Sequence, residues 1–112
     1  MFSGKSIAQN HINVNCGDKN IYFTKSIVLM CGLKPGEYVH FLNDYTDWKF
    51  YSNDNPDGFK LNANKVCLRI TNIALARLIL KTTGFNMKKN FYVKKTNIVI
   101  DNCPVFQLSP YR

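Results

Sequence analysis

The segment that most constrains the fold is residues 21–41, where several local signals follow one another. Residues 21–23 are a short β-prone run, and Thr24 stands where it can cap a helix whose apolar part is residues 27–30. Gly32 stands where a helix ends in the left-handed conformation, which favours glycine. The segment therefore predicts a strand followed directly by a short helix.

A tight turn and a second strand follow that helix. Leu33 can fold back onto the last helical turn. Pro35 pre-sets φ at the second position of the turn, and Gly36 accepts the positive φ of the third. Residues 38–42 are rich in aromatic and β-branched side chains, which is typical of a strand. This order of elements is a signal of fold, and it bears on function only indirectly.

The second half of the chain repeats this order. Residues 66–70 alternate between apolar and polar side chains, as a strand does. A helix is expected next, with Thr71 or Asn72 as its N-cap, residues 73–80 as its apolar part and Gly84 at its end. The same sequence of strand, helix and glycine stop thus occurs twice.

These two series predict an internal repeat, with one copy over residues 12–61 and the other over residues 66–108. Chance similarity between two small α+β units is the alternative, because the matching pieces are short. If the repeat is real, each copy is too small to bury its own apolar face, and the two copies bury their faces against each other.

The remaining segments are expected to be short strands and polar connections. The sequence Asn-Pro-Asp-Gly at residues 55–58 is a strong turn signal, and the strands on either side of it are expected to form a hairpin. The further expected strands are residues 11–16, 48–51, 59–61, 91–93, 98–100 and 105–108. The expected turns, loops and linkers are residues 17–20, 43–47, 62–65, 86–89 and 101–102.

The whole chain, residues 1–112, is expected to be a single domain. Its 112 residues, 46% hydrophobic and 20% charged, have the size and balance of one globular unit. It has no apolar run long enough to span a membrane and no signal peptide, so a cytoplasmic protein with reduced thiols is expected.

The order and spacing of residues 14–42 resemble the swapped-hairpin domain of AbrB-like transition-state regulators and related antitoxins. Each piece of the pattern is common alone, and the resemblance lies in their order. Residues 66–108 resemble the domain only in outline. The residues that carry the resemblance are Ile21, Phe23, Thr24, Lys25, Ile27, Gly32, Leu33, Lys34, Gly36, Glu37, Val39 and Phe41.

The resemblance implies an interleaved β-barrel built from two copies, which usually come from two chains. A tandem pair would resemble the single-chain versions of this architecture. The expected fold class is therefore α+β, mostly β, with two strand–helix–strand repeats that form one swapped-hairpin-like β-barrel with two short helices.

The resemblance also implies a small basic DNA-binding protein that regulates transcription. DNA-binding members usually place arginines in the first hairpin and charges on the short helix. This chain departs from that pattern, because its helix carries no charge after its first lysine and most basic residues lie in the second half. The candidate nucleic-acid-binding residues are Lys19, Lys25, Arg69, Arg77, Lys88, Lys89, Lys94 and Lys95.

The charge distribution independently favours an anionic partner. The formal net charge is +8, and residues 59–112 carry ten Lys or Arg against the single carboxylate of Asp101. Residues 44–58 carry four aspartates and one lysine. A basic half favours nucleic acid as the first partner to consider. The other interpretation is that the lysines keep a small aromatic-rich domain soluble.

No catalytic, metal-binding or cofactor site is expected, and so no enzymatic activity. The four cysteines are scattered without a Cys-x-x-Cys pair. His11 and Cys16 would point to opposite faces of a strand. Asp54 and Asp57 are paired carboxylates that fit turn chemistry better than catalysis.

The second hypothesis is a non-enzymatic interaction or assembly module that binds no DNA. Examples are a structural protein of a phage or mobile element, or an antitoxin-like protein, encoded by the A/T-rich genome of a bacterium or its phage. Residues 26–31 motivate it, because this uncharged helix is expected to be buried on nearly all sides, against the second copy, a homodimer partner or another protein. An apolar patch left exposed in the monomer would mark that interface.

Overall fold

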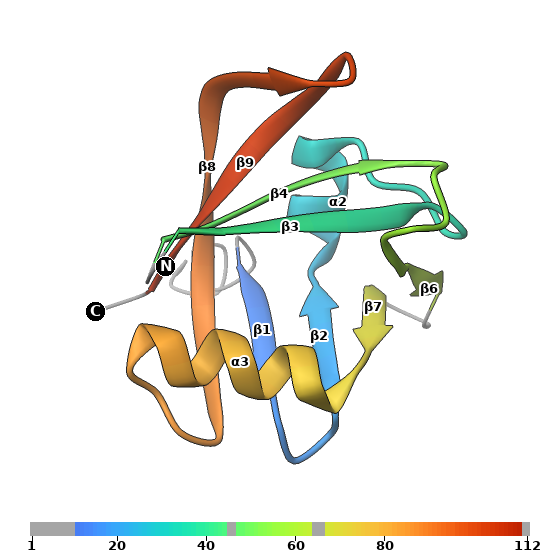
Figure 1. Ribbon diagram of the computed structural model, residues 1–112. Helices are drawn as coiled ribbons and strands as arrows, with labels where there is room; N and C mark the ends of the chain where they lie inside the picture. Colours follow the sequence, from blue (N-terminus) through green and yellow to red (C-terminus); the bar gives the residue numbers. More distant parts are fainter. Residues whose placement is uncertain (1–10, 45–46, 64–66, 111–112) are drawn as a thin grey trace, which may run out of the picture.

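The computed structural model describes residues 11–44, 47–63 and 67–110. Within these ranges the chain forms mainly strands, with two short helices (Figure 1). The helices are α2 (Lys25–Cys31) and α3 (Ile73–Thr83). The strands are β1 (Ile12–Asn15), β2 (Asn20–Phe23), β3 (Tyr38–Asp44), β4 (Asp47–Asn53), β5 (Phe59–Lys60), β6 (Asn62–Ala63), β7 (Leu68–Thr71), β8 (Lys88–Ile100) and β9 (Cys103–Pro110).

The strands make one antiparallel sheet in the order β5-β3-β4-β9-β8-β1-β2-β7-β6. Only Leu61 separates β5 from β6 in the chain, so the two ends of this order meet and the sheet nearly closes into a barrel (Figure 1). The prediction of a mostly β fold with a barrel-like sheet and two short helices is confirmed.

The interior of the barrel is filled by aromatic and aliphatic side chains. Phe23, Phe50 and Phe91 are fully buried, and the rings of Phe23 and Phe50 meet edge to face with centroids 6.0 Å apart. Ile12 and Val14 of β1 are buried as well. Because side chains alternate along a strand, the residues between them face outward.

The expected start of α2 is only partly right. Thr24 occupies the N-cap position, but its hydroxyl donates to the backbone carbonyl of His11 at 2.9 Å and does not cap the helix. The helix ends as predicted, since Gly32 has a φ of 66°. The N–H of Leu33 folds back to donate to the carbonyl of Val28 at 3.0 Å.

Helix α3 follows the predicted pattern at both ends. Of the two candidate caps, Asn72 is the one used, and its side-chain oxygen accepts a hydrogen bond from the N–H of Leu75 at 2.9 Å. Gly84 ends the helix with a φ of 89°. The N–H of Phe85 then donates to the carbonyl of Leu80 at 2.8 Å, which closes the C-terminus.

The strand at Phe59–Lys60 pairs with a different neighbour from the one expected. The turn at residues 55–58 is present, but β5 pairs with β3, where Phe59 stands opposite Val39. Strand β4 lies on the other side of β3. The predicted β4–β5 hairpin is therefore wrong. A turn signal shows where the chain reverses, but it does not specify which strand the next segment pairs with.

Several polar segments expected as connections belong to strands. Residues 43–44 extend β3, Asp47 begins β4, residues 62–63 form β6 and Lys88 begins β8. A strand with a solvated face needs no apolar residues on that face, so polar composition alone did not mark a loop. Part of the expected loop at residues 43–47 lies outside the described residues, at 45–46. The same holds at residues 64–66 for the end of the expected linker and the first residue of the expected strand.

The two strands expected at residues 91–93 and 98–100 are parts of one strand. Strand β8 runs through both, with an irregularity in its pairing to β9 between Lys95 and Val99. Such a bulge inserts unpaired residues without ending the strand. The tips of β8 and β9 form an arm that projects beyond the barrel (Figure 1).

The expectation that the first helix is buried on nearly all sides is wrong. Ile27 and Cys31 pack into the core, but the side chains of Leu29 and Met30 are 73% and 49% exposed. A helix that rests on a barrel with one face leaves its other face to solvent, whatever the residues there.

The predicted repeat relates β2 to β7, β3 to β8 and β4 to β9. Strand β2 pairs with β7, and β4 pairs with β9, whereas β3 and β8 are separated by β4 and β9. Tyr22 stands opposite Arg69. Strand β5 pairs with β3, and β6, which follows it in the chain, pairs with β7. Strand β1 occupies a similar position in the other half, because it pairs with β8 on one side and β2 on the other.

Candidate nucleic-acid interface

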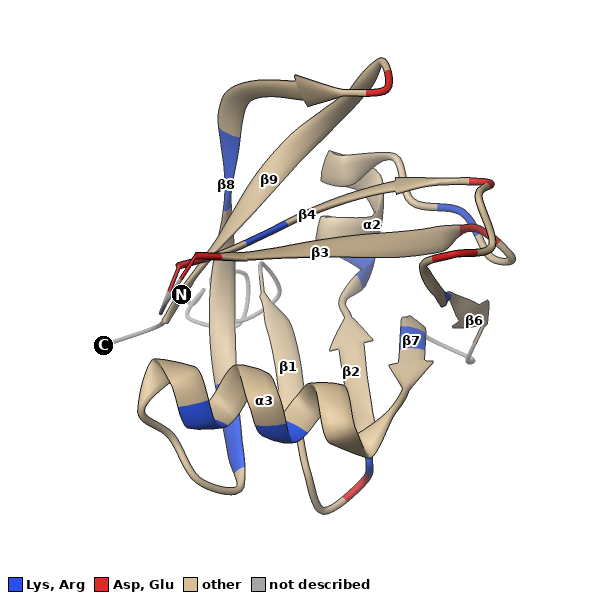
Figure 2. Ribbon diagram, in the orientation of Figure 1, with Lys and Arg blue, Asp and Glu red and all other residues tan. Residues whose placement is uncertain are grey.

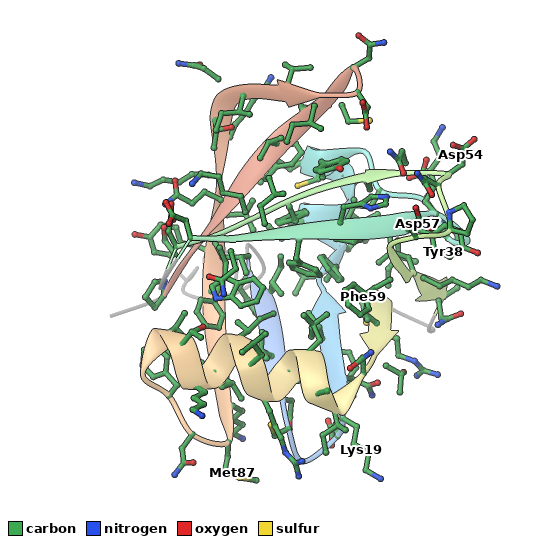
Figure 3. The ribbon with its side chains drawn as sticks, viewed as in Figure 1. Lys19, Tyr38, Asp54, Asp57, Phe59 and Met87 are labelled. Carbon is green, nitrogen blue, oxygen red and sulfur yellow. The ribbon has the colours of Figure 1, made fainter. Side chains whose placement is uncertain are left out.

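Five basic residues come together where α3, the β1–β2 turn and the start of β8 meet. The turn and β8 are joined by the N–H of Cys16, which donates to the carbonyl of Met87 at 2.8 Å. Figure 3 places Lys19 and Met87 at the same end of the molecule, and Figure 2 places the basic bands of α3 there. We call this group the basic end, and its members are Lys19, Arg77, Lys81, Lys88 and Lys89.

Helix α3 supplies two of these cations from its exposed side. The helix is amphipathic, and it buries Leu75 and Ile79 while Arg77 and Lys81, one turn apart, are exposed. The two side chains line a hollow of about 550 Å³ beside the helix C-terminus. The remaining lining residues are Cys16, Gly84, Phe85, Asn86 and Met87.

The start of β8 carries the next two cations on opposite faces of the strand. Lys89 pairs with the buried Val14, and its ammonium lies 4.6 Å from the centroid of the Phe85 ring, a cation–π contact. Lys88 pairs with Asn15 on the outer face. Lys89 is thus held in place, whereas Lys88 is exposed to an incoming ligand.

The outer face of four neighbouring strands is polar. Across β8, β1, β2 and β7, Asn90 stands opposite Asn13, Asn13 opposite Tyr22, and Tyr22 opposite Arg69. Cross-strand partners project from the same side of a sheet. We call this set the amide face, and its members are Asn13, Asn15, Tyr22, Arg69, Lys88 and Asn90.

Hydrogen bonds order the amide face. The side-chain amide of Asn13 donates to the side-chain oxygen of Asn90 at 2.6 Å. The side-chain oxygen of Asn15 accepts from the backbone N–H of Asp18 at 3.1 Å, and the hydroxyl of Tyr22 donates to the Asp18 carboxylate at 3.0 Å. A hollow of about 460 Å³ opens on this face, lined by Asn13, Asn15, Lys88, Lys89 and Asn90.

The charges around the basic end are nearly all of one sign. Residues 12–22 and 72–92 carry its five cations and one carboxylate, Asp18. Most other carboxylates lie on or beside the β3–β4 hairpin (Figure 2). Cations grouped with few carboxylates raise the local concentration of anions.

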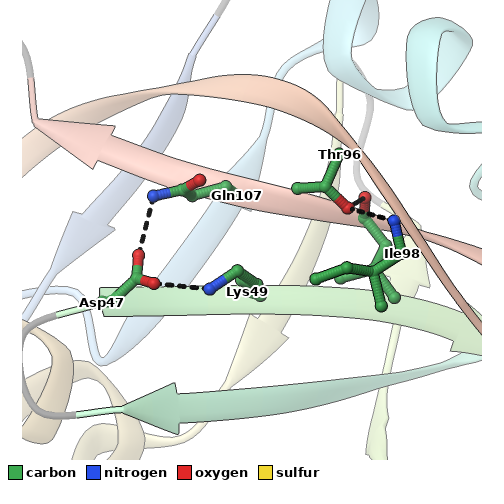
Figure 4. A network of polar contacts seen from close by, with 6 residues as sticks. Asp47, Lys49, Thr96, Ile98 and Gln107 are labelled. Atoms are coloured by element: carbon green, nitrogen blue, oxygen red, sulfur yellow. Dashed lines mark hydrogen bonds and ion pairs between the residues drawn. The ribbon is translucent and has the colours of Figure 1, made fainter.

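One of the distant carboxylates is already engaged within the protein. Asp47 pairs with Lys49 on the same strand and accepts a hydrogen bond from the side-chain amide of Gln107 at 2.7 Å (Figure 4). These contacts stabilise the β4–β9 ladder. Figure 4 also shows Thr96, whose hydroxyl oxygen accepts from the N–H of Ile98 at 3.1 Å within the β8 bulge.

The structure brings together about half of the sequence-predicted residues. Lys19, Arg77, Lys88 and Lys89 lie at the basic end, and Arg69 lies on the amide face. The others lie apart: Lys25 begins α2, and Lys94 and Lys95 lie farther along β8 (Figure 2).

Sequence reasoning missed four residues of this region. Lys81 is exposed on α3 but is not among the candidate residues named from the sequence. Asn13 and Asn15 lie in the strand expected at residues 11–16, and nothing in the local sequence indicates that Asn90 lies beside them. That neighbour comes from the long-range β1–β8 pairing, which no local pattern encodes.

The thiols and possible metal ligands of the described ranges are dispersed. All four cysteines are free, and no three His, Cys, Asp or Glu side chains gather there as metal ligands would. Burial raises the pKa of Cys31 to about 12, which keeps that thiol protonated. The pKa of Cys67 is also raised by burial, against the lowering influence of Arg69.

Comparison with family models, curated proteins and solved structures finds no match to this chain. Neither helix among the described residues is long and apolar enough to cross a membrane.

Proposed function

We propose that this chain is a small DNA-binding protein, a regulator of transcription of the AbrB-like type, which holds duplex DNA by its phosphates. The observation that carries the proposal is the basic end. Its cations come from three separate segments of the chain and lie together with one carboxylate, Asp18. Phosphate contacts by Lys and Arg supply most of the affinity of non-specific DNA binding.

The pairing of the strands supports the AbrB-like part of the proposal. In the proposed arrangement two copies of a strand–helix–strand unit interleave within one chain. The β2–β7 and β4–β9 ladders join strands that the repeat equates, and each half places a helix at the same point of the order. A two-fold arrangement of two copies would produce this pairing.

The strength of salt dependence follows from the number of phosphates contacted. If each cation of the basic end neutralises one phosphate, the five contacts predict that log K falls with log salt with a slope of about −4.5. We expect micromolar affinity for duplex of random sequence at moderate salt, because non-specific binding of this kind lies in that range.

The test is a salt series of binding to a labelled random duplex of about 30 base pairs, followed by fluorescence anisotropy. The double variant R77Q/K81Q removes two contacts and should lower the slope to about −2.7. The matched control K94Q/K95Q removes the same charge from a distant part of β8 and should leave the slope near that of the unchanged protein. Equal effects of the two variants, or no binding at low salt, would sink the proposal.

A second candidate, a protein-interaction module, is favoured by the exposed apolar side of α2. Leu29 and Met30, adjacent in the chain, are 73% and 49% exposed there, and exposed apolar side chains mark an interface where they form a contiguous patch. We expect a concentration-dependent homodimer in light scattering that the variant L29S/M30S converts to monomer. Ile98 and Val99, exposed on the β8–β9 arm, provide the control I98S/V99S. A monomer at every concentration would count against this homodimer.

A further inference from the structure

The amide face has a composition that its position in the fold does not require. Asparagine is depleted in strands, yet Asn13, Asn15 and Asn90 occupy adjacent outward positions on β1 and β8. The alternate positions of these strands carry buried residues such as Val14 and Phe91. The outer face therefore differs in composition from the core, and its side chains are hydrogen-bonding groups.

We propose that the amide face reads base edges in the major groove of duplex DNA, with preference for adenine. This inference rests on the proposed function, because it requires that the basic end first holds the duplex. Phosphate contacts alone do not distinguish one DNA sequence from another, so base contacts by the amide face would add a sequence preference.

The Asn13–Asn90 pair has the hydrogen-bonding groups that an adenine requires. The amide of Asn13 donates to the oxygen of Asn90 at 2.6 Å, and among the described residues neither side chain makes another hydrogen bond within the protein. The pair keeps the Asn13 oxygen as an acceptor and the Asn90 amide as a donor. Adenine presents a donor at N6 and an acceptor at N7 in the major groove, so the two edges are complementary.

The side chains around the Asn13–Asn90 pair are also polar or basic. Strands β1 and β8 are neighbours within the sheet, between β9 and β2, and the hollow of about 460 Å³ lies among their polar residues. Lys88 precedes Asn90 by two positions on β8, and Arg69 lies beyond Tyr22 on β7, so both cations are available for contacts to phosphates beside the bases that the asparagines read. The hydroxyl of Tyr22 donates a hydrogen bond to the Asp18 carboxylate, which fixes the Tyr22 ring between Asn13 and Arg69.

The test begins by selecting bound sequences from a pool of random duplexes with the whole protein. Adenine-containing sites should be enriched. The best site and a version with G·C at the selected adenines are then compared. The double variant N13A/N90A should lose about 5- to 100-fold in discrimination between the two, while its salt slope on random duplex stays unchanged. The control N97A alters an exposed asparagine on the β8 arm and should keep full discrimination.

A second double variant, N13V/N90V, guards against misfolding, because valine favours strands and cannot contact a base edge by hydrogen bonds. It should lose discrimination as N13A/N90A does. Binding of random duplex with unaltered discrimination in both variants would overturn base reading and leave the proposed function standing. Tighter binding of single strands than of duplex would also overturn it. No binding of any duplex at low salt would overturn both proposals.

Discussion

At the scale of single residues, Trp48 shows how a polar atom is accommodated in the core. Its indole N–H donates to the hydroxyl of Thr82 at 2.8 Å, while the ring packs against Phe41 with centroids 6.0 Å apart. Thr82 in turn donates to the carbonyl of Leu78 at 2.9 Å. A buried indole N–H without a partner would destabilise the fold by about 1–3 kcal/mol. This chain of contacts fixes α3 to β4, and with it the position of the cations on α3.

Cys31 offers a prediction at the same scale. Its thiol has a pKa of about 12 in the folded protein, against 9.0 in the unfolded chain. Between these values the folded state retains a proton that the unfolded state has lost, so the free energy of unfolding decreases as pH rises above about 9. Below pH 9 this group contributes no pH dependence.

Urea unfolding at pH 8 and pH 10.5 measures this effect. The variant C31A, which has no group to titrate there, should lose less stability over that interval than the unchanged protein, although its stability at pH 8 is lower because of the cavity. An equal loss in both proteins would show that Cys31 is accessible and ionises normally.

At the scale of elements, the ends of the helices position the candidate interface. The glycine stop of α3 turns the chain so that Phe85 reaches back to the helix and β8 begins four residues after Gly84. That short connection brings Lys88 and Lys89 to the same end of the molecule as Lys81. An extra helical turn would carry β8 away from the cations of α3, so the stop decides both the fold and the charge cluster.

Substitution of Gly84 tests this role. Its φ of 89° is one that residues with a Cβ rarely adopt, and a Cβ there would meet no atom within 4 Å. The cost of Gly84→Ala is therefore conformational, about 1–2 kcal/mol of unfolding free energy. Urea unfolding should give this loss, and Gly84→Asn should lose less because asparagine tolerates the left-handed region better. Equal stability of the alanine variant and the unchanged protein would contradict the argument.

At the scale of the whole molecule, closure of the sheet and separation of charge act together. The segment from β5 to β6 pairs with β3 on one side and β7 on the other, which joins the two edges of the sheet. Edges that are joined cannot pair with other chains. Closure also sets the carboxylates of the β3–β4 side apart from the basic end (Figure 2). The basic end therefore lies apart from most of the carboxylates of the described residues.

Much of the local structure could be predicted from the sequence. The strand at β2, both glycine helix stops and the turn at residues 55–58 have short-range causes in their own residues, and all are present. The predictions that failed concern long-range choices, such as the partner of β5 and the exposure of Leu29. The candidate site divides in the same way, since four of the five cations of its basic end can be named from the sequence, whereas Lys81 and the asparagines cannot.

The sequence by itself determined most of the elements, their order and the excess of basic residues in the second half, because these depend on residues close together in the chain. Only the tertiary structure decided which strands pair, and so which of those cations lie together and which asparagines they border. The reason is physical: the pairing of β1 with β8 joins residues more than seventy positions apart, such as Asn13 and Asn90, and depends on how the whole barrel buries its core.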